Sequence, residues 1–255
     1  MIRLLKCEYL KTRRRYIFPT ALVITAAGLC FALYGMDDYS AEQLRMGWMS
    51  QLYQLPLVNT IFMSVLSVIV SSRLADIEHK GNNFKQLAVL SEKGSIYDAK
   101  LIYGLAMVLL CNLISWAVTI AAGYIAGFEG DVPIKLYLLY LLFTLVPTAV
   151  VYIFQHNMSM LFKNQAVTFF SGVIGTFCGL FSMFLPQIPA LRKIFIWGYY
   201  GVLQFVGLFG WTSETRYSTA YFAVMDIDWL FFGILIIIGI MLYIIGKELF
   251  KRKEF

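Results

Sequence analysis

Six runs of apolar residues follow one another along the chain, and the short segments between them hold most of the charges. Each run approaches or exceeds the ~20 residues that an α-helix needs to cross the hydrocarbon core of a bilayer. The pattern predicts an all-α polytopic membrane protein that forms a single domain over residues 1–255. The predicted spans are residues 17–36, 55–72, 101–127, 136–154, 166–185 and 229–246. The fifth span is predicted to end at Pro186 and Pro189.

The positions of the basic residues predict the orientation. Three arginines, Arg13, Arg14 and Arg15, precede the first span, and four basic residues follow the last one between Lys247 and Lys253. Loops rich in Lys and Arg stay on the cytoplasmic side. Both ends and the segment 73–100 are therefore expected in the cytoplasm.

Composition supports this prediction. Hydrophobic residues make up 60% of the chain and charged residues 14%, whereas soluble domains have roughly 45–50% and about 25%. The net charge of +6 reflects the clusters beside the spans, so no nucleic-acid partner is expected. In the segment 1–16, Ile2, Leu5 and Tyr9 recur at helical spacing, which predicts an amphipathic helix lying in the membrane interface.

One further apolar run, residues 194–211, contains four glycines and several aromatic residues. A seventh span here would place the basic C-terminal tail outside, against the charge pattern. We predict short helices at the outer interface or a re-entrant pair shielded by protein. Arg192, Lys193 and Arg216 would then lie outside.

The sequence lacks recognisable catalytic chemistry. No predicted span has an ionisable residue near its centre, where such groups mark proton relays and ion paths. Neither a P-loop nor an H-E-x-x-H motif occurs, although these motifs identify many nucleotide-binding and zinc sites. The chain is therefore not expected to be an enzyme, and it should bind no metal or other cofactor. Any ATP would be hydrolysed by another chain.

The segment 73–100 is the most informative part of the sequence. Phe84, Leu87 and Ala88 fall on one face of a short helix, and Gly81, Asn82 and Asn83 predict a turn before it. An apolar helical face held beside the membrane suits docking into a groove of a soluble partner. An ordinary interfacial loop helix fits the same pattern, and the pattern alone does not separate the two.

Two motifs add a resemblance. Glu78 precedes Phe84-Lys85-Gln86-Leu87, and Ile96-Tyr97-x-Ala99-Lys100-Leu101 then opens a span. With the opening Leu5-x-x-Glu8-x-x-Lys11, this order resembles the permease subunits of ABC-2-type transporters. Within that family the chain is most similar to the lantibiotic-protection permeases, which the stretch Trp197-Gly198-Tyr199-Tyr200 supports. Phe84 stands where many relatives have Trp.

The resemblance implies an ABC exporter in which two permeases, identical or sister chains, pair above two ATPase subunits that bind ATP and magnesium. Residues 1–12 would be the elbow helix, and residues 78–93 would be the coupling helix, with Phe84 and Leu87 as anchors. The substrate would be a lantibiotic or similar amphipathic antimicrobial peptide expelled from the membrane for self-protection. The implied ATPase-coupling residues are Glu78, Gly81, Phe84, Lys85, Leu87 and Ala88.

Two further groups of residues are candidates within this framework. Gly172, Gly175 and Gly179 lie on one face of the fifth span and permit close approach of a second permease, or equally packing within the chain. The outer aromatic residues Trp197, Tyr199, Tyr200 and Trp211 are candidates for substrate contact, or form an interfacial belt. An ABC-2 permease for another substrate and a membrane scaffold without transport remain the alternative functions.

Overall fold

The structure is a computed structural model of the chain, and it describes residues 1–81, 83–185, 187–188, 190–212 and 219–254. Asn82 of the predicted turn, Pro186 and Pro189 after the predicted fifth span, and Arg216 lie outside the described residues.

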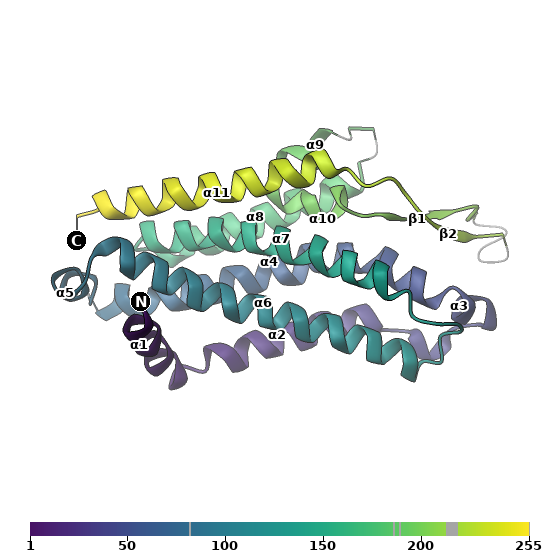
Figure 1. Cartoon of the computed structure of the whole chain (residues 1–255), viewed down its shortest axis with the longest axis horizontal. Helices are drawn as coiled ribbons and strands as arrows, with labels where there is room; N and C mark the ends of the chain where they lie inside the picture. Colours follow the sequence, from purple (N-terminus) through teal and green to yellow (C-terminus); the bar gives the residue numbers. More distant parts are fainter. Residues whose placement is uncertain (82, 186, 189, 213–218, 255) are drawn as a thin grey trace.

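Long helices running side by side make up most of the molecule (Figure 1). The seven longest helices are α1 Ile2–Arg13, α2 Ile17–Leu33, α4 Gly47–Gly81, α6 Lys93–Ile125, α7 Ile134–Leu161, α8 Gln165–Met183 and α11 Trp229–Arg252. Of these, α4, α6, α7, α8 and α11 are each long and apolar enough to cross a membrane. A sixth crossing arises if α1 and α2, which meet at a bend of 72°, count as one span. The chain is thus a helical multi-pass membrane protein.

Helix α4 forms the centre of the bundle, because it packs against α2, α6, α7 and α8. Within its most apolar 18 residues, 67% are buried, whereas the matching figure for the peripheral α11 is 17%. Small hydroxyl side chains account for much of this close packing. Ser64, Ser67 and Ser71 of α4 are all buried, as expected for helices that associate in lipid through small residues.

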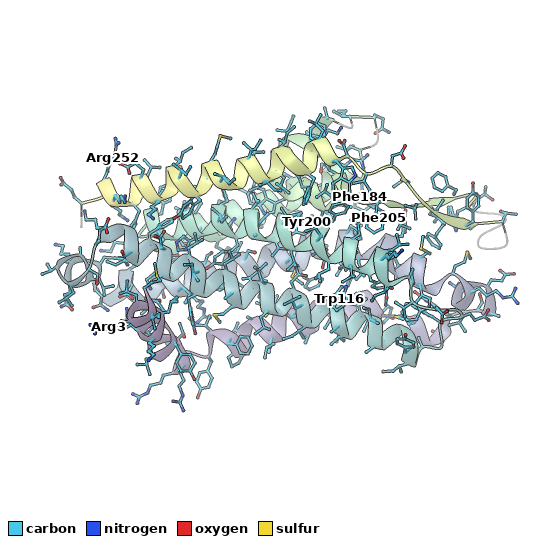
Figure 2. The ribbon with its side chains drawn as sticks, viewed as in Figure 1. Arg3, Trp116, Phe184, Tyr200, Phe205 and Arg252 are labelled. Carbon is cyan, nitrogen blue, oxygen red and sulfur yellow. The ribbon has the colours of Figure 1, made fainter. Side chains whose placement is uncertain are left out.

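The bundle has two distinct ends (Figure 1). We call one the terminal end, where α1, the short helix α5 Asn83–Leu90 and both chain termini lie. We call the other the hairpin end, where α3 Ala41–Arg45 lies near the antiparallel strands β1 Val206–Phe209 and β2 Tyr221–Val224. The side chains of Arg3 and Arg252 mark the terminal end, and Trp116 and Phe205 lie in the half toward the hairpin (Figure 2).

Several helices extend beyond the predicted apolar runs. Helix α4 continues from the predicted end at residue 72 to Gly81, and α7 continues from residue 154 to Leu161. Polar residues in these extensions lie inside the protein, where buried Glu78 forms ion pairs with Lys11 and Lys100 and the buried His156 ring packs on Tyr97. The hydropathy pattern alone therefore predicted ends for these two helices that lie before their observed ends.

The segment after α8 makes no crossing within the described residues. It forms the short helices α9 Ala190–Ile194, η2 Ile196–Gly198 and α10 Tyr199–Val202, and then enters β1. The remaining short helix is η1 Met36–Asp38, which leads into α3. Short helices were predicted for residues 194–211, but the two-stranded sheet was not, and it is a small addition to a fold that agrees with the predicted all-α membrane protein. Its register pairs Val206 with Val224 and Phe209 with Tyr221.

Candidate functional site

Four charged side chains meet inside the terminal end. The Lys100 ammonium lies 2.8 Å from a Glu8 carboxylate oxygen and 3.1 Å from one of Glu78. Lys11 contacts the same two carboxylates, at 2.6 Å from Glu78 and 3.5 Å from Glu8. The side chains of Lys100 and Glu78 are fully buried. We call this group of two acids and two bases the ion cluster.

The ion cluster joins three helices. Glu8 and Lys11 come from one face of α1, Glu78 from the last turn of α4, and Lys100 from the second turn of α6. Lys100 also donates to the Leu74 carbonyl at 3.2 Å. Because the cluster is charge-balanced, each buried charge has an opposite partner, which such groups require in a medium of low dielectric. Helix α1 is therefore tied directly to α4 and α6.

The sequence motifs contain all four members of the ion cluster, but they did not predict that these side chains would meet. Glu8, Lys11, Glu78 and Lys100 all belong to the three motifs that carry the family resemblance. Their sequence separations gave no sign that they would meet. Glu78 was expected to serve in ATPase coupling, and the structure places its side chain inside the protein instead.

Helix α5 forms where the short cytoplasmic helix was predicted, and it has one buried face. Phe84 is only 4% exposed, and its ring packs against His79 of α4 at 4.9 Å and Phe250 of α11 at 5.7 Å. Leu87 and Ala88 are half-buried on the same side. The apolar face predicted to dock on a partner is thus occupied by this chain's own helices.

The opposite face of α5 is open. Val89 is 86% exposed and Leu90 79%, and the polar side chains of Lys85 and Gln86 are exposed beside them. Gly81, at the end of α4, is exposed as well. Two large aliphatic side chains at the tip of a bundle are a surface available for a partner, and the sequence did not single them out because they lie off the predicted apolar face.

The C-terminal segment closes the terminal end. Asp98 of α6 accepts a hydrogen bond from Lys247 at 2.6 Å and another from Tyr243 at 3.0 Å. Lys253 donates to the carbonyls of Met160 and Leu161 at 3.1 and 2.7 Å. These bonds join α6, α7 and the C-terminal segment at the end of the bundle that presents Val89 and Leu90.

The three glycines of α8 face the chain itself. A side-chain carbon added at Gly175 or Gly179 would collide with Trp197, and one added at Gly172 would collide with Val68. The alternative of packing within the chain therefore describes these residues. The other face of α8 is exposed and apolar, with Phe170, Ile174, Phe177 and Phe181 on it.

Most of the four outer aromatic candidates also face the interior of this chain. Trp197, Tyr199 and Tyr200 are buried, and only Trp211 is exposed, at 51%. Tyr200 shares a 2.9 Å hydrogen bond with Thr148 of α7. These three side chains pack inside the bundle, which leaves Trp211 as the one of the four that is exposed on the surface.

A recess of about 330 Å³ opens near the hairpin end, between the end of α2, α4 and the end of α8. Its walls are mainly apolar, with Phe31, Leu57 and Phe184 among them, and the amides of Gln54 and Gln204 provide polar groups. Gln204 is fixed by a 3.2 Å hydrogen bond to the Tyr53 carbonyl. A mainly apolar recess of this size that contains a few polar groups is typical of a ligand site.

Comparison with known families identifies the chain. Residues 4–179, more than two thirds of the protein, match the family described as ABC-2 family transporter protein, whereas no curated relative matches the sequence. The chain belongs to this family and is a membrane permease of an ABC transporter. Membership implies a partnership with ABC ATPase subunits, because the permease is the transport component and not the catalytic one.

Proposed function

We propose that this permease couples to its ATPase through the open face of α5, with the terminal end in the cytoplasm. The observation that carries the proposal is the pair of exposed aliphatic side chains, Val89 and Leu90, on a helix whose other face is anchored to α4 and α11. An amphipathic helix that lays apolar residues into a groove is a recurring mode of protein recognition. Lys85 and Gln86 would form the polar rim of this contact.

The anchoring of α5 supports a role in transmitting motion. Phe84 packs on His79, the residue next to Glu78 of the ion cluster. A displacement of α5 by the ATPase would therefore act on the end of α4 and, through the ion pairs, on α1 and α6. Because α4 is the most buried helix of the bundle, the displacement would reach the membrane-spanning part through packed side chains.

Co-purification of the ATPase tests the coupling surface. Val89→Asp and Leu90→Asp should each reduce the ATPase recovered with the full-length permease at least tenfold. Val224→Asp, the same substitution at an exposed residue of the hairpin end, should leave recovery unchanged. Equal recovery with all three variants would contradict the proposed coupling surface, whereas no recovery of an ATPase with the unaltered permease would favour a membrane scaffold.

We further propose that the substrate is an amphipathic cationic peptide of the lantibiotic type, exported for resistance. The resemblance to lantibiotic-protection permeases supports this, as does the mixed apolar and amide lining of the recess. Exposed acidic side chains at the hairpin end, including Asp38, Glu42 and Asp226, would attract a cation. Two ATPases and a second permease, identical or sister, would complete the complex.

Peptide resistance of cells that express the complete transporter tests the substrate. Ala32→Phe, which fills the recess, should lower resistance at least fivefold while ATPase recovery stays normal. Ala121→Phe, on an exposed part of α6, should retain resistance. If the intact transporter gives no resistance although the ATPase co-purifies, the protein exports another substrate.

A further inference from the structure

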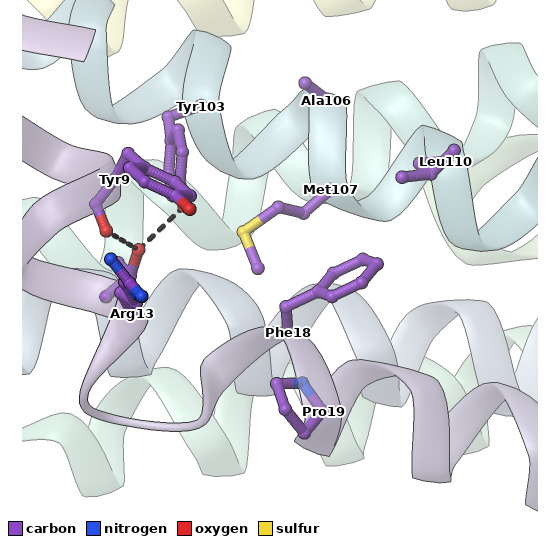
Figure 3. Close-up of a pocket in the computed structure, with 9 residues that line it drawn as sticks. Tyr9, Arg13, Phe18, Pro19, Tyr103, Ala106, Met107 and Leu110 are labelled. Atoms are coloured by element: carbon purple, nitrogen blue, oxygen red, sulfur yellow. Dashed lines mark hydrogen bonds between the residues drawn. The ribbon is translucent and has the colours of Figure 1, made fainter. Parts of the chain in front are cut away.

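A second cavity lies where the elbow meets the bundle, at the other end from the recess. Its volume is about 380 Å³, and it is bounded by α1, the start of α2 and the face of α6 that includes Tyr103 and Met107 (Figure 3). The 72° bend between α1 and α2 produces the cavity, because the two helices diverge at Tyr16 while both pack on α6. Tyr16 makes this turn with a left-handed backbone, at φ 52°. We call this cavity the elbow crease.

The interior of the elbow crease is apolar. Phe18 and Met107 point toward each other across it, and Leu110 and Ala106 line the far side (Figure 3). At its end toward α1, Thr12 and Tyr103 share a 2.7 Å hydrogen bond. The polar groups at this end are thus partly satisfied within the protein, and the remaining walls offer contacts to hydrocarbon.

The mouth of the elbow crease carries positive charge. Arg13 lines it, and Arg14 and Arg15 follow in the exposed turn between the helices. Among the described residues, none of these three arginines forms a salt bridge with a carboxylate, whereas Lys11 on the same helix is paired twice. Guanidinium groups suit phosphate through planar, bidentate hydrogen bonds.

The position of the elbow crease in the membrane indicates which class of ligand it would bind. The surrounding surface of α1 and α6 is apolar and exposed, with Leu10, Ile102 and Leu110 all more than 40% exposed. In a multi-pass membrane protein such a surface faces lipid. Since α1 is predicted to lie in the membrane interface, the crease opens at the level where phosphate groups meet acyl chains.

We propose that the elbow crease binds one anionic glycerophospholipid from the leaflet at the terminal end. An acyl chain occupies the apolar interior between Phe18, Met107 and Leu110, and the phosphate contacts Arg13. The lipid would thereby hold α1 at its angle to α2. This site is separate from the recess at the hairpin end and does not depend on the identity of the exported substrate.

Native mass spectrometry of the full-length chain tests the proposal, with phosphatidylglycerol and phosphatidylcholine supplied in equal amounts. The wild-type chain should retain one phosphatidylglycerol in preference to phosphatidylcholine. Arg13→Gln should lower that preference about fivefold, the contribution of one basic residue near an anionic membrane surface. Ala106→Phe, which fills the crease, should abolish retention of this lipid. Glycerol phosphate, added as a headgroup without acyl chains, should not displace it.

Two matched variants provide the controls. Arg3→Gln removes a positive charge from the same helix away from the crease, and Ala121→Phe adds the same ring elsewhere on α6. Both should retain lipid as the wild type does. Any one of three results would overturn the proposal. The wild type could retain the two lipids equally, Arg3→Gln and Arg13→Gln could lose phosphatidylglycerol equally, or glycerol phosphate could displace the lipid. If Ala106→Phe does not fold, the comparison of Arg13→Gln with Arg3→Gln decides.

Discussion

The two ends of this permease are held together by different chemistry. At the terminal end, buried opposite charges join α1, α4 and α6, with Lys100 between Glu8 and Glu78. At the hairpin end, among the residues that the structure describes, the buried polar groups are neutral. Tyr137 donates a 2.6 Å hydrogen bond to Gln51, and Trp116 donates to the Tyr137 carbonyl at 2.9 Å.

This difference has a mechanical consequence. Removing one member of a buried ion pair leaves an uncompensated charge, which costs far more than losing one neutral hydrogen bond. The ion cluster therefore holds α1, α4 and α6 as one unit, as the proposed coupling to an ATPase at this end requires. The neutral network can exchange single hydrogen bonds at lower cost, as the proposed release of a substrate at the other end requires.

The largest expected effect comes from breaking the ion cluster. Lys100→Met should destabilise the protein by about 3–5 kcal/mol, because Glu8 keeps only the 3.5 Å contact with Lys11 and the buried acids then outnumber their base. Thermal unfolding of the purified chain in detergent measures this. Arg252→Ala, which removes an exposed pair with Glu248, should change stability by less than about 0.5 kcal/mol.

A double variant sharpens that result. Glu78→Gln with Lys100→Met removes one acid and one base and leaves Glu8 with Lys11. It should be more stable than Lys100→Met alone, since the remaining charges balance again. If the double variant is the less stable of the two, packing and not charge explains the cluster.

A smaller effect is expected from crowding the packing between α8 and Trp197. Gly175→Ala should destabilise by about 1–3 kcal/mol, because the added carbon meets the ring of Trp197 and overpacking has a cost of this size. Gly233→Ala in α11 has open space around it and should stabilise by up to about 1 kcal/mol. The opposite signs of these two shifts in melting temperature are the test.

The smallest effect should come from the neutral network. Tyr137→Phe removes the hydrogen bond to Gln51 and should cost about 1–2 kcal/mol in unfolding free energy, because the buried amide loses a partner. Tyr221→Phe, at an exposed residue of β2, should be neutral in the same assay. A loss for Tyr137→Phe as large as that for Lys100→Met would remove the contrast between the two ends.

The sequence predicted the helical membrane fold because apolar length is a strong local signal. It predicted the short helix at Phe84 for the same reason, since its periodicity is local. It did not predict the buried side of that helix, because Phe250, which covers Phe84 together with His79, lies 166 positions away. The apolar face that suggested docking is the face that packs inside.

Long-range packing also explains the other differences between the predicted and the observed structure. The α8 glycines suggested a contact between permeases. Their neighbour Trp197 reaches them only because the chain folds back after α8, which the local sequence pattern does not indicate. The hairpin was not predicted because Val206–Phe209 and Tyr221–Val224 are short and separated. Nothing local marks the elbow crease either, since its walls come from α1, α2 and α6.

Photo-cross-linking from α5 tests the central claim most directly. A benzophenone side chain placed at position 89 of the full-length permease should, on illumination in cells, give a product with the mass of this chain plus one ATPase subunit. The same group at position 224 should give no such product. An ATPase product from position 224 and none from position 89 would show that the terminal end does not meet the ATPase and would contradict the account.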